Sequence, residues 1–121
     1  MIYKIGMLCK HFKGNNLLEK NIYRIEQIGV DGKDINSNLI TYTGDNDLSS
    51  SKNLVVYSNL FQDNKLFVRE YEDISKELDE EKKNLYKQNI KVEPLNNEEI
   101  RVINDDNFIS EKRQFVLKKY Q

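Results

Sequence analysis

Arginine is the residue type in this sequence with the clearest potential for ligand binding, because it is rare. The chain contains 19 cationic residues, of which 15 are lysines and four are arginines, namely Arg24, Arg69, Arg101 and Arg113. A guanidinium presents a planar fork that binds phosphate through two hydrogen bonds, whereas a lysine acts as a point charge. The arginines are therefore the first candidates for contact with an anion. For Arg24, the alternative is a surface ion pair with Glu26.

Arg69 lies in a segment that predicts a β-hairpin. Residues 54–71 contain two runs rich in β-branched and aromatic side chains, separated by a short polar turn. Side chains alternate across a strand, so Phe67, Arg69 and Tyr71 share one face. Val68 lies on the other face, which we expect to be core. A guanidinium between two rings suits a ligand contact, and the alternative is an arginine that extends over aromatic surface with its charge in solvent.

The turn after the first predicted strand is a second candidate for anion binding. Gly14 and the two asparagines that follow it favour a turn, because Gly and Asn tolerate positive φ. Backbone amides in such a turn, with Lys10 and Lys13 beside them, would suit a phosphate. The alternative is an ordinary solvated loop, which the spacing alone favours.

Sequence motifs for catalysis are absent. The chain has no G-x-S-x-G, P-loop, H-E-x-x-H or C-x-x-C pattern. Cys9 and His11 would share one face of a strand, but no third group is placed to orient them as a nucleophile and base. A single histidine and a single cysteine also provide too few ligands for a soft metal site. We therefore expect no enzymatic activity, no cofactor and no metal.

The composition excludes several other classes of protein. The 19 cationic and 20 acidic residues are balanced, whereas proteins that bind duplex nucleic acid usually carry a basic face. The N-terminus lacks the apolar core of a signal peptide, and no apolar run approaches the roughly 20 residues that span a bilayer. We expect a soluble, cytoplasmic protein with no membrane partner, and 121 residues predict one domain.

Short strands must position the candidate side chains. In addition to the hairpin, we expect strands over residues 2–7, 21–28, 38–43, 90–94 and 100–103. Residues 114–120 are compatible with a strand or a helix, and we favour a terminal strand. The resulting fold class is mainly β (α+β), as a small barrel or a bent antiparallel sheet with extra C-terminal strands.

One amphipathic helix is expected between these strands. Over residues 73–88 the hydrophobic period changes, with Ile74, Leu78 and Leu85 three or four residues apart or in multiples of that spacing. The charged residues between them are best explained as a solvated helical face.

Four short motifs resemble a known family when they are taken together. They are His-Phe-Lys-Gly at 11–14, Tyr-Arg-Ile at 23–25, Val-Val-Tyr at 55–57 and Phe-Val-Arg at 67–69. In this order they resemble a small bacterial and phage domain of unknown function that has an SH3-like barrel. The match covers about residues 7–73. Phe67 stands where the family commonly has Trp, and Glu70 stands where it has Pro, so the chain resembles a divergent member.

A longer version of this domain, with a helix and added strands, is similar to the phage Thoeris anti-defence proteins, the first family of that name. The resemblance implies a single domain over residues 1–121, with an SH3-like core at 7–73 and a helix plus C-terminal extension at 74–121. It implies a sponge in the host cell cytoplasm that binds cyclic ADP-ribose isomers, and in some members cyclic oligonucleotides, without cleaving them. It also implies a homo-oligomer, dimer or hexamer, with ligand pockets between subunits.

The resemblance also directs attention to particular side chains, because a cyclic ADP-ribose isomer has a diphosphate and an adenine. Arginine forks suit the diphosphate, and aromatic rings suit the adenine, with stacking worth roughly 1–3 kcal/mol per base. The expected ligand-binding residues are Arg24, Arg69 and Arg113 for phosphate or ribose, Phe12, Phe67 and Tyr86 for stacking, and Asn96 for the adenine edge. Four of these seven lie in the matched motifs, and the other three rest on residue type and an expected interface position.

Two other functions are compatible with the sequence. An SH3-like protein-interaction module would use the hairpin face and the helix to dock a partner protein, and it would not bind nucleotides. An enzyme that cleaves a nucleotide would instead release a product.

Overall fold

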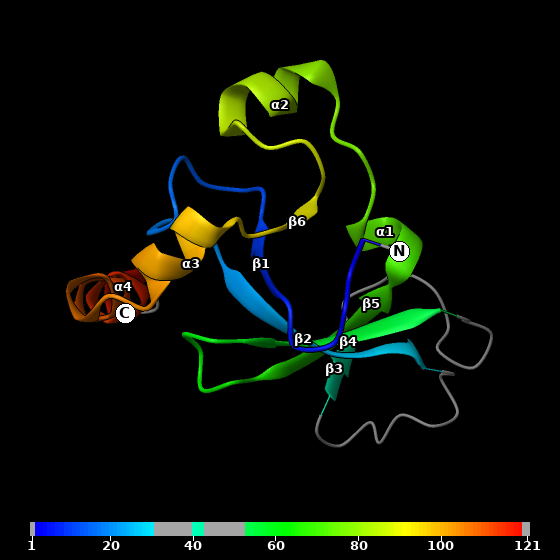
Figure 1. Ribbon diagram of the computed structural model, residues 1–121, viewed down its shortest axis with the longest axis horizontal. Helices are drawn as coiled ribbons and strands as arrows, with labels where there is room; N and C mark the ends of the chain where they lie inside the picture. Colours follow the sequence, from blue (N-terminus) through cyan, green and yellow to red (C-terminus); the bar gives the residue numbers. More distant parts are fainter. Residues whose placement is uncertain (1, 31–39, 43–52, 120–121) are drawn as a thin grey trace.

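The computed structural model describes residues 2–30, 40–42 and 53–119, and a six-stranded sheet forms its centre (Figure 1). The strands are β1 Leu8–His11, β2 Ile22–Val30, β3 Ile40–Tyr42, β4 Leu54–Asn59, β5 Leu66–Glu70 and β6 Val92–Pro94. Their order is β3-β5-β4-β2-β1-β6, and only the β3–β5 pair is parallel. The expected α+β class with an antiparallel sheet is confirmed, and the described strands form an open sheet.

The strands agree with the sequence prediction in the hairpin and differ at the N-terminus. β4 and β5 pair in antiparallel register, with Tyr57 opposite Phe67 and Val55 opposite Arg69. The first strand begins only at Leu8, so the prediction over residues 2–7 is wrong. The strand expected over 38–43 is present at Ile40–Tyr42, and its remaining residues lie outside the described part of the chain.

The single helix expected over residues 73–88 is wrong, because two short helices occupy this region. They are α1 Tyr71–Ile74 and α2 Glu80–Tyr86. Residues 75–79 leave the helix, and Glu77 instead forms an isolated β-bridge with Ile90. Asp79 then caps α2 by accepting a hydrogen bond from the backbone amide of Lys82 at 2.8 Å. The break separates the apolar positions, so Leu78 is buried and Leu85 is 59% exposed.

The strands expected at residues 100–103 and 114–120 are also wrong, since both segments are helical. The helices are α3 Asn97–Ile103 and α4 Asp106–Lys119. A capping box starts α3, in which Asn96 and Glu99 accept hydrogen bonds from each other's backbone amides. The periodicity of a short apolar run does not distinguish a strand from a helix. At residues 100–103, the capping box that precedes the run favours the helix.

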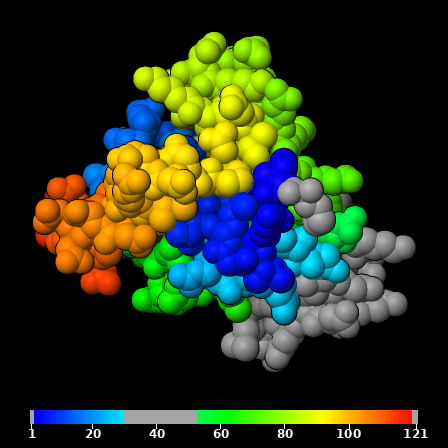
Figure 2. Space-filling model, in the orientation of Figure 1, coloured from blue at the N-terminus to red at the C-terminus, as the bar shows by residue number. Residues whose placement is uncertain are grey.

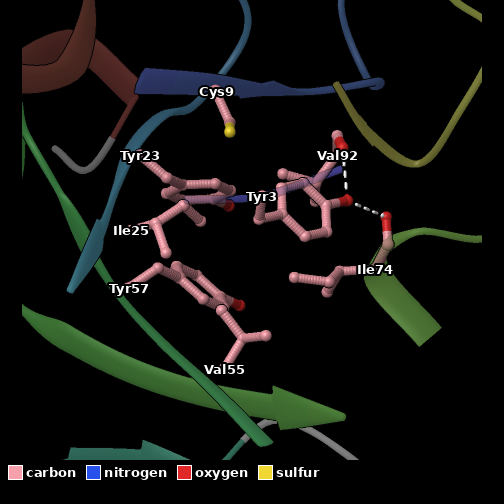
Figure 3. Close-up of a cluster of buried hydrophobic side chains, with 8 residues drawn as sticks. All are labelled: Tyr3, Cys9, Tyr23, Ile25, Val55, Tyr57, Ile74 and Val92. Atoms are coloured by element: carbon pink, nitrogen blue, oxygen red, sulfur yellow. Dashed lines mark hydrogen bonds between the residues drawn. The ribbon is translucent and has the colours of Figure 1, made fainter. Parts of the chain in front are cut away.

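A cluster of tyrosine and aliphatic side chains packs on one face of the sheet (Figure 3). This tyrosine cluster consists of Tyr3, Cys9, Tyr23, Ile25, Val55, Tyr57, Ile74 and Val92. The Tyr3 hydroxyl lies 2.8 Å from the carbonyl oxygen of Ile74 and 2.6 Å from that of Val92. Its contacts therefore connect the N-terminal segment to α1 and to β6. Since Phe67 and Tyr71 also pack against the cluster, and Val68 on the other face is fully buried, both faces of the hairpin contribute to the core.

An aliphatic cluster packs on the opposite face, where α3 and α4 lie. Its buried members are Ile22, Leu95 and Ile103, and Leu8, Leu17, Leu60, Phe61, Ile100 and Phe108 pack against them. Figure 2 shows the α2 region (yellow-green) and the α3–α4 region (orange) as separate projections, with N-terminal residues (blue) between them. Within the described residues, no helix combines the length and apolar character needed to cross a membrane.

Candidate functional site

Four of the seven expected ligand-binding residues line two separate hollows in the structure. Phe12 and Arg69 line a hollow of about 730 Å³, here called the cationic pocket. Arg24 and Arg113 line a second hollow of about 820 Å³, here called the apolar groove. The pocket lies beside the tyrosine cluster and the groove lies beside the aliphatic cluster, so the three arginines do not form one site.

The cationic pocket lies where the end of β1 meets β5, the α1–α2 connection and the start of β6. Its lining residues are His11, Phe12, Lys13, Arg69, Asp73, Lys76, Glu77, Leu78, Asp79, Lys82 and Lys91. Five of these side chains are cationic and three are acidic, which gives an excess of two positive charges with a neutral histidine. Such an excess favours an anionic ligand.

Arg69 occupies the centre of an ion-pair network in this pocket. It forms an ion pair with Asp73, four residues later, and Asp73 Oδ1 also lies 3.4 Å from Lys91 Nζ. Partial burial acts to raise the pKa of Asp73, but the charges and hydrogen bonds of Arg69 and Lys91 outweigh it and hold this pKa below its ordinary value. Arg69 Nε is buried and has no hydrogen-bond partner. The guanidinium therefore has one donor that its contacts with Asp73 do not satisfy.

His11 is a neutral side chain in positive surroundings. Burial lowers its pKa to about 4, and the charges of Lys13, Lys91, Arg69 and Lys20 act in the same direction. His11 Nδ1 accepts a hydrogen bond from the Lys13 backbone amide at 3.3 Å, which leaves the ring proton on Nε2. At neutral pH the imidazole thus adds a hydrogen-bond donor to the pocket without adding charge. The lowered pKa also reports the positive potential that these cations create.

The acidic side chains of the pocket are engaged by neighbouring groups. Asp73 pairs with Arg69 and Lys91, Asp79 caps α2, and Glu77 pairs with Lys83. By contrast, the side chains of Lys13, Lys76 and Lys82 form no ion pair with any described residue. These three ammonium groups are the cations that a ligand can contact without breaking an ion pair between described residues, whereas Arg69 Nε is buried.

Phe12 forms a wall of the pocket and offers little surface for stacking. It is only 6% exposed, Lys82 Nζ lies 5.8 Å from its ring centroid, and the Tyr86 ring meets it at 5.3 Å, nearly edge-on. Behind the two rings, the buried Lys20 donates hydrogen bonds to the carbonyls of Phe12 and Tyr86. Phe12 and Tyr86 therefore pack as a supporting pair, and Tyr86 does not line the pocket.

Phe67 and Asn96, the remaining expected residues, line neither hollow. The Phe67 ring stacks on Tyr57 at a centroid distance of 5.7 Å and an interplanar angle of 21°. Asn96 uses its side chain in the cap of α3. Both side chains thus have packing or capping partners within the fold.

The turn after β1 forms as the sequence predicts, but only one of its lysines faces the pocket. Gly14 has a φ of +114°, and a Cβ there would lie 3.0 Å from the Glu19 backbone. Lys13 lines the cationic pocket. Lys10 instead forms ion pairs with Glu93 and Glu99, so it takes no part in this pocket.

The Cys9 thiol is not activated as a nucleophile. Cys9 is fully buried in the tyrosine cluster, and burial raises its pKa to about 12. It remains protonated at neutral pH. Among the described residues, no group of three or more His, Cys, Asp and Glu side chains is arranged to hold a metal ion.

Sequence reasoning missed three cationic residues of the pocket, namely Lys76, Lys82 and Lys91. The charge run of residues 76–87 was expected to form a solvated helical face, and the break at residues 75–79 directs Lys76 and Lys82 to the pocket instead. Lys91 lies at the cationic pocket because β6 pairs with β1, which places the neighbouring Val92 opposite His11. No local signal marks this long-range pairing.

Comparison with known proteins finds no relative, because no family model, curated protein or solved structure matches the chain. The function must therefore be inferred from the pocket itself and from the resemblance of the four sequence motifs.

Proposed function

We propose that this chain binds a small, multiply charged anion of the nucleotide type in the cationic pocket and holds it without chemical change. The observation that carries this proposal is the convergence of five cationic side chains on one pocket, three of which are lysines that form no ion pair with any described residue. The volume of about 730 Å³ lies within the roughly 300–1,000 Å³ of known ligand pockets.

A diphosphate is the ligand group that best fits these donors. Arg69 can supply hydrogen bonds from its guanidinium, while Lys13, Lys76 and Lys82 add point charges around it. The neutral His11 supplies a donor from Nε2. Because Phe12 is buried, we assign most of the binding free energy to the phosphates and little of it to stacking of a base.

The finer proposal is that the ligand is a cyclic ADP-ribose isomer or a related cyclic oligonucleotide. The resemblance of the chain to a longer version of this domain, the phage Thoeris anti-defence proteins, supports this proposal, and four of the motif residues, His11, Phe12, Lys13 and Arg69, line the pocket. The chain would then act as a phage-encoded sponge that removes the signal of a TIR enzyme and blocks Thoeris-type immunity. The same resemblance supports a homo-oligomer, which sedimentation of the protein with and without ligand would test.

Calorimetric titration tests this function. The wild-type protein is titrated with a panel of cyclic ADP-ribose isomers, cyclic dinucleotides and cyclic trinucleotides, and each bound ligand is recovered by heating and analysed by chromatography. We expect sub-micromolar binding of at least one member and recovery of that ligand intact.

Two variants locate the binding. Arg69→Gln removes the guanidinium and should weaken binding, whereas Lys118→Gln removes a cation from the far end of α4 and should leave it unchanged. A flat titration across the panel would refute nucleotide binding, and a chemically altered ligand would refute sequestration.

A further inference from the structure

The apolar groove has a composition different from that of the cationic pocket. It runs between α4 and the turn that joins β4 to β5, and its thirteen lining residues include seven large aliphatic or aromatic side chains. Its only charged residues are Arg24, Arg113 and Asp63. The other six lining residues are polar or charged, so the groove presents apolar side chains and polar groups in similar numbers.

The two arginines of the groove are available to a ligand. Arg24 projects from β2, where it lies opposite Leu8 and Ser58 of the neighbouring strands. Arg113 projects from α4. Both side chains are exposed, and neither forms an ion pair or a hydrogen bond with any described residue. Unlike Arg69, neither is ion-paired with a carboxylate of a described residue, and Asp63 is the one acidic side chain among the described residues that line the groove.

One face of α4 forms an apolar wall beside these arginines. Ile109, Arg113, Val116 and Leu117 line the groove, and their spacing places them on one side of the helix. The face spans about 12 Å, at 1.5 Å per residue. At its far end, Leu117 is 64% exposed, whereas Ile103 on the floor is 4% exposed. On this face of α4, apolar side chains therefore lie one helical turn to either side of the Arg113 guanidinium.

A buried lysine fixes this wall in place. Lys112, next to Arg113, is 2% exposed and donates hydrogen bonds to three backbone carbonyls, those of Leu17, Leu18 and Lys20. Its amine also lies 5.9 Å from the ring centroid of Phe61, a lining residue. These contacts hold α4 against the connection between β1 and β2, so the backbone position of Arg113 is set before a ligand arrives.

We propose that the apolar groove binds an anionic amphiphile, a carboxylate with an unbranched apolar chain, whose head group contacts Arg24 and Arg113 and whose chain lies along α4. A guanidinium matches a carboxylate through paired hydrogen bonds, and the aliphatic wall removes the chain from water. Free fatty carboxylates and anionic membrane lipids share this chemistry. The groove fits the free form, because α4 and the hairpin turn flank its floor on two sides.

Titration with sodium decanoate, followed by calorimetry and by amide-detected NMR, tests this site. We expect saturable binding, with shifts confined to α4, residues 60–64 and the part of β2 around Arg24. Hexanoate should bind more weakly because its chain is shorter, and decyltrimethylammonium should not bind because its head group is cationic. Decanoate binding in the groove does not depend on the cationic pocket, so the amide signals around His11 and Arg69 should not shift.

Matched variants assign the contacts. Arg24→Gln and Arg113→Gln should each weaken decanoate binding by about tenfold or more, and Leu117→Ser should reduce the advantage of decanoate over hexanoate. Arg101→Gln removes a guanidinium outside the groove and should change nothing. The substituted side chains are exposed, and thermal unfolding of each variant verifies that it folds.

Three outcomes would overturn the proposal. They are the absence of saturable decanoate binding, undiminished binding by the Arg24→Gln, Arg113→Gln double variant, and binding to vesicles of phosphatidylglycerol without binding to free decanoate.

Discussion

The cationic pocket and the apolar groove are similar in size but hold their arginines in different ways. In the pocket, Arg69 is already paired with Asp73 and is surrounded by lysines from distant parts of the chain. In the groove, Arg24 and Arg113 form no ion pair with any described residue, and seven of the thirteen lining residues are apolar. The pocket should therefore bind through many charges and be sensitive to salt, whereas the groove should bind through apolar contact and be less sensitive.

Each hollow also depends on its own buried polar anchor. Lys112 joins α4, a wall of the groove, to the carbonyls of residues 17–20. The Tyr3 hydroxyl contacts the carbonyls of Ile74 and Val92, close to two walls of the pocket (Figure 3). The two hollows should therefore respond separately to substitutions of these anchors.

The largest effect is expected from the anchor of the groove. Lys112→Met removes the shared donor of three carbonyls that are buried or partly buried, and we expect the free energy of unfolding to fall by about 4 kcal/mol, since each unsatisfied buried acceptor costs roughly 1–3 kcal/mol. Urea denaturation measures the loss. Lys118→Met, on the exposed side of the same helix, should change stability by less than about 0.5 kcal/mol. A similar stability for both variants would show that Lys112 is not an anchor.

Acid should destabilise the protein through the pocket. The pKa of His11 is about 4 in the folded chain and 6.5 in the unfolded chain, so the unfolded state binds the proton more tightly. Stability is then complete above pH 6.5 and declines as the pH falls towards 4 and below it, by a total of about 3 kcal/mol.

His11→Asn isolates this contribution, because asparagine retains an acceptor and does not titrate. The stability of wild type and variant, measured by urea denaturation at several pH values, should diverge between pH 6.5 and 4. Parallel curves would show that His11 is not buried in a neutral form.

Arg69→Gln should separate the two hollows by affinity. Loss of charged hydrogen bonds to a phosphate corresponds to about 2 kcal/mol, or roughly a thirtyfold increase in the Kd of a nucleotide ligand. Decanoate binding in the groove should not change. Calorimetry of both ligands on the same protein makes this comparison, and an equal loss for both would mean that the substitution disturbs the whole fold.

The smallest effect is expected from the anchor of the pocket. The Tyr3 hydroxyl has one proton and two carbonyl neighbours, so Tyr3→Phe should reduce the free energy of unfolding by about 1 kcal/mol and weaken nucleotide binding slightly. Tyr71→Phe is the matched control, because the Tyr71 hydroxyl accepts a hydrogen bond from the exposed amide of Ile2. Thermal unfolding should rank Tyr3→Phe as the less stable variant, and the reverse order would contradict this role of Tyr3.

Local sequence signals predicted the parts of the fold that form from neighbouring residues. The β4–β5 hairpin followed from two strand-like runs and a polar turn. The start of α3 carries a local signal in the capping pair Asn96 and Glu99, but the apolar run at residues 100–103 was predicted to be a strand. In α4 the same ambiguity between short apolar runs led to the wrong prediction.

The site was harder to predict because it depends on register and on long-range pairing. The alternation of the sequence assigns Arg24 and Arg69 each to one face of its own strand. Only the pairing of β2, β4 and β5 shows that the two side chains lie on opposite faces of the sheet. Lys91 reaches the pocket through the pairing of β6 with β1, about eighty positions away in the chain. Residue type alone identified the arginines and could not assign them to two hollows.

The most direct test of the central claim is a crystal structure of the protein grown with the tightest-binding member of the nucleotide panel. We predict that the diphosphate lies in the cationic pocket, within hydrogen-bonding distance of Arg69 and close to Lys82. A ligand seated in the apolar groove against Arg24 and Arg113, with an empty cationic pocket, would contradict this account.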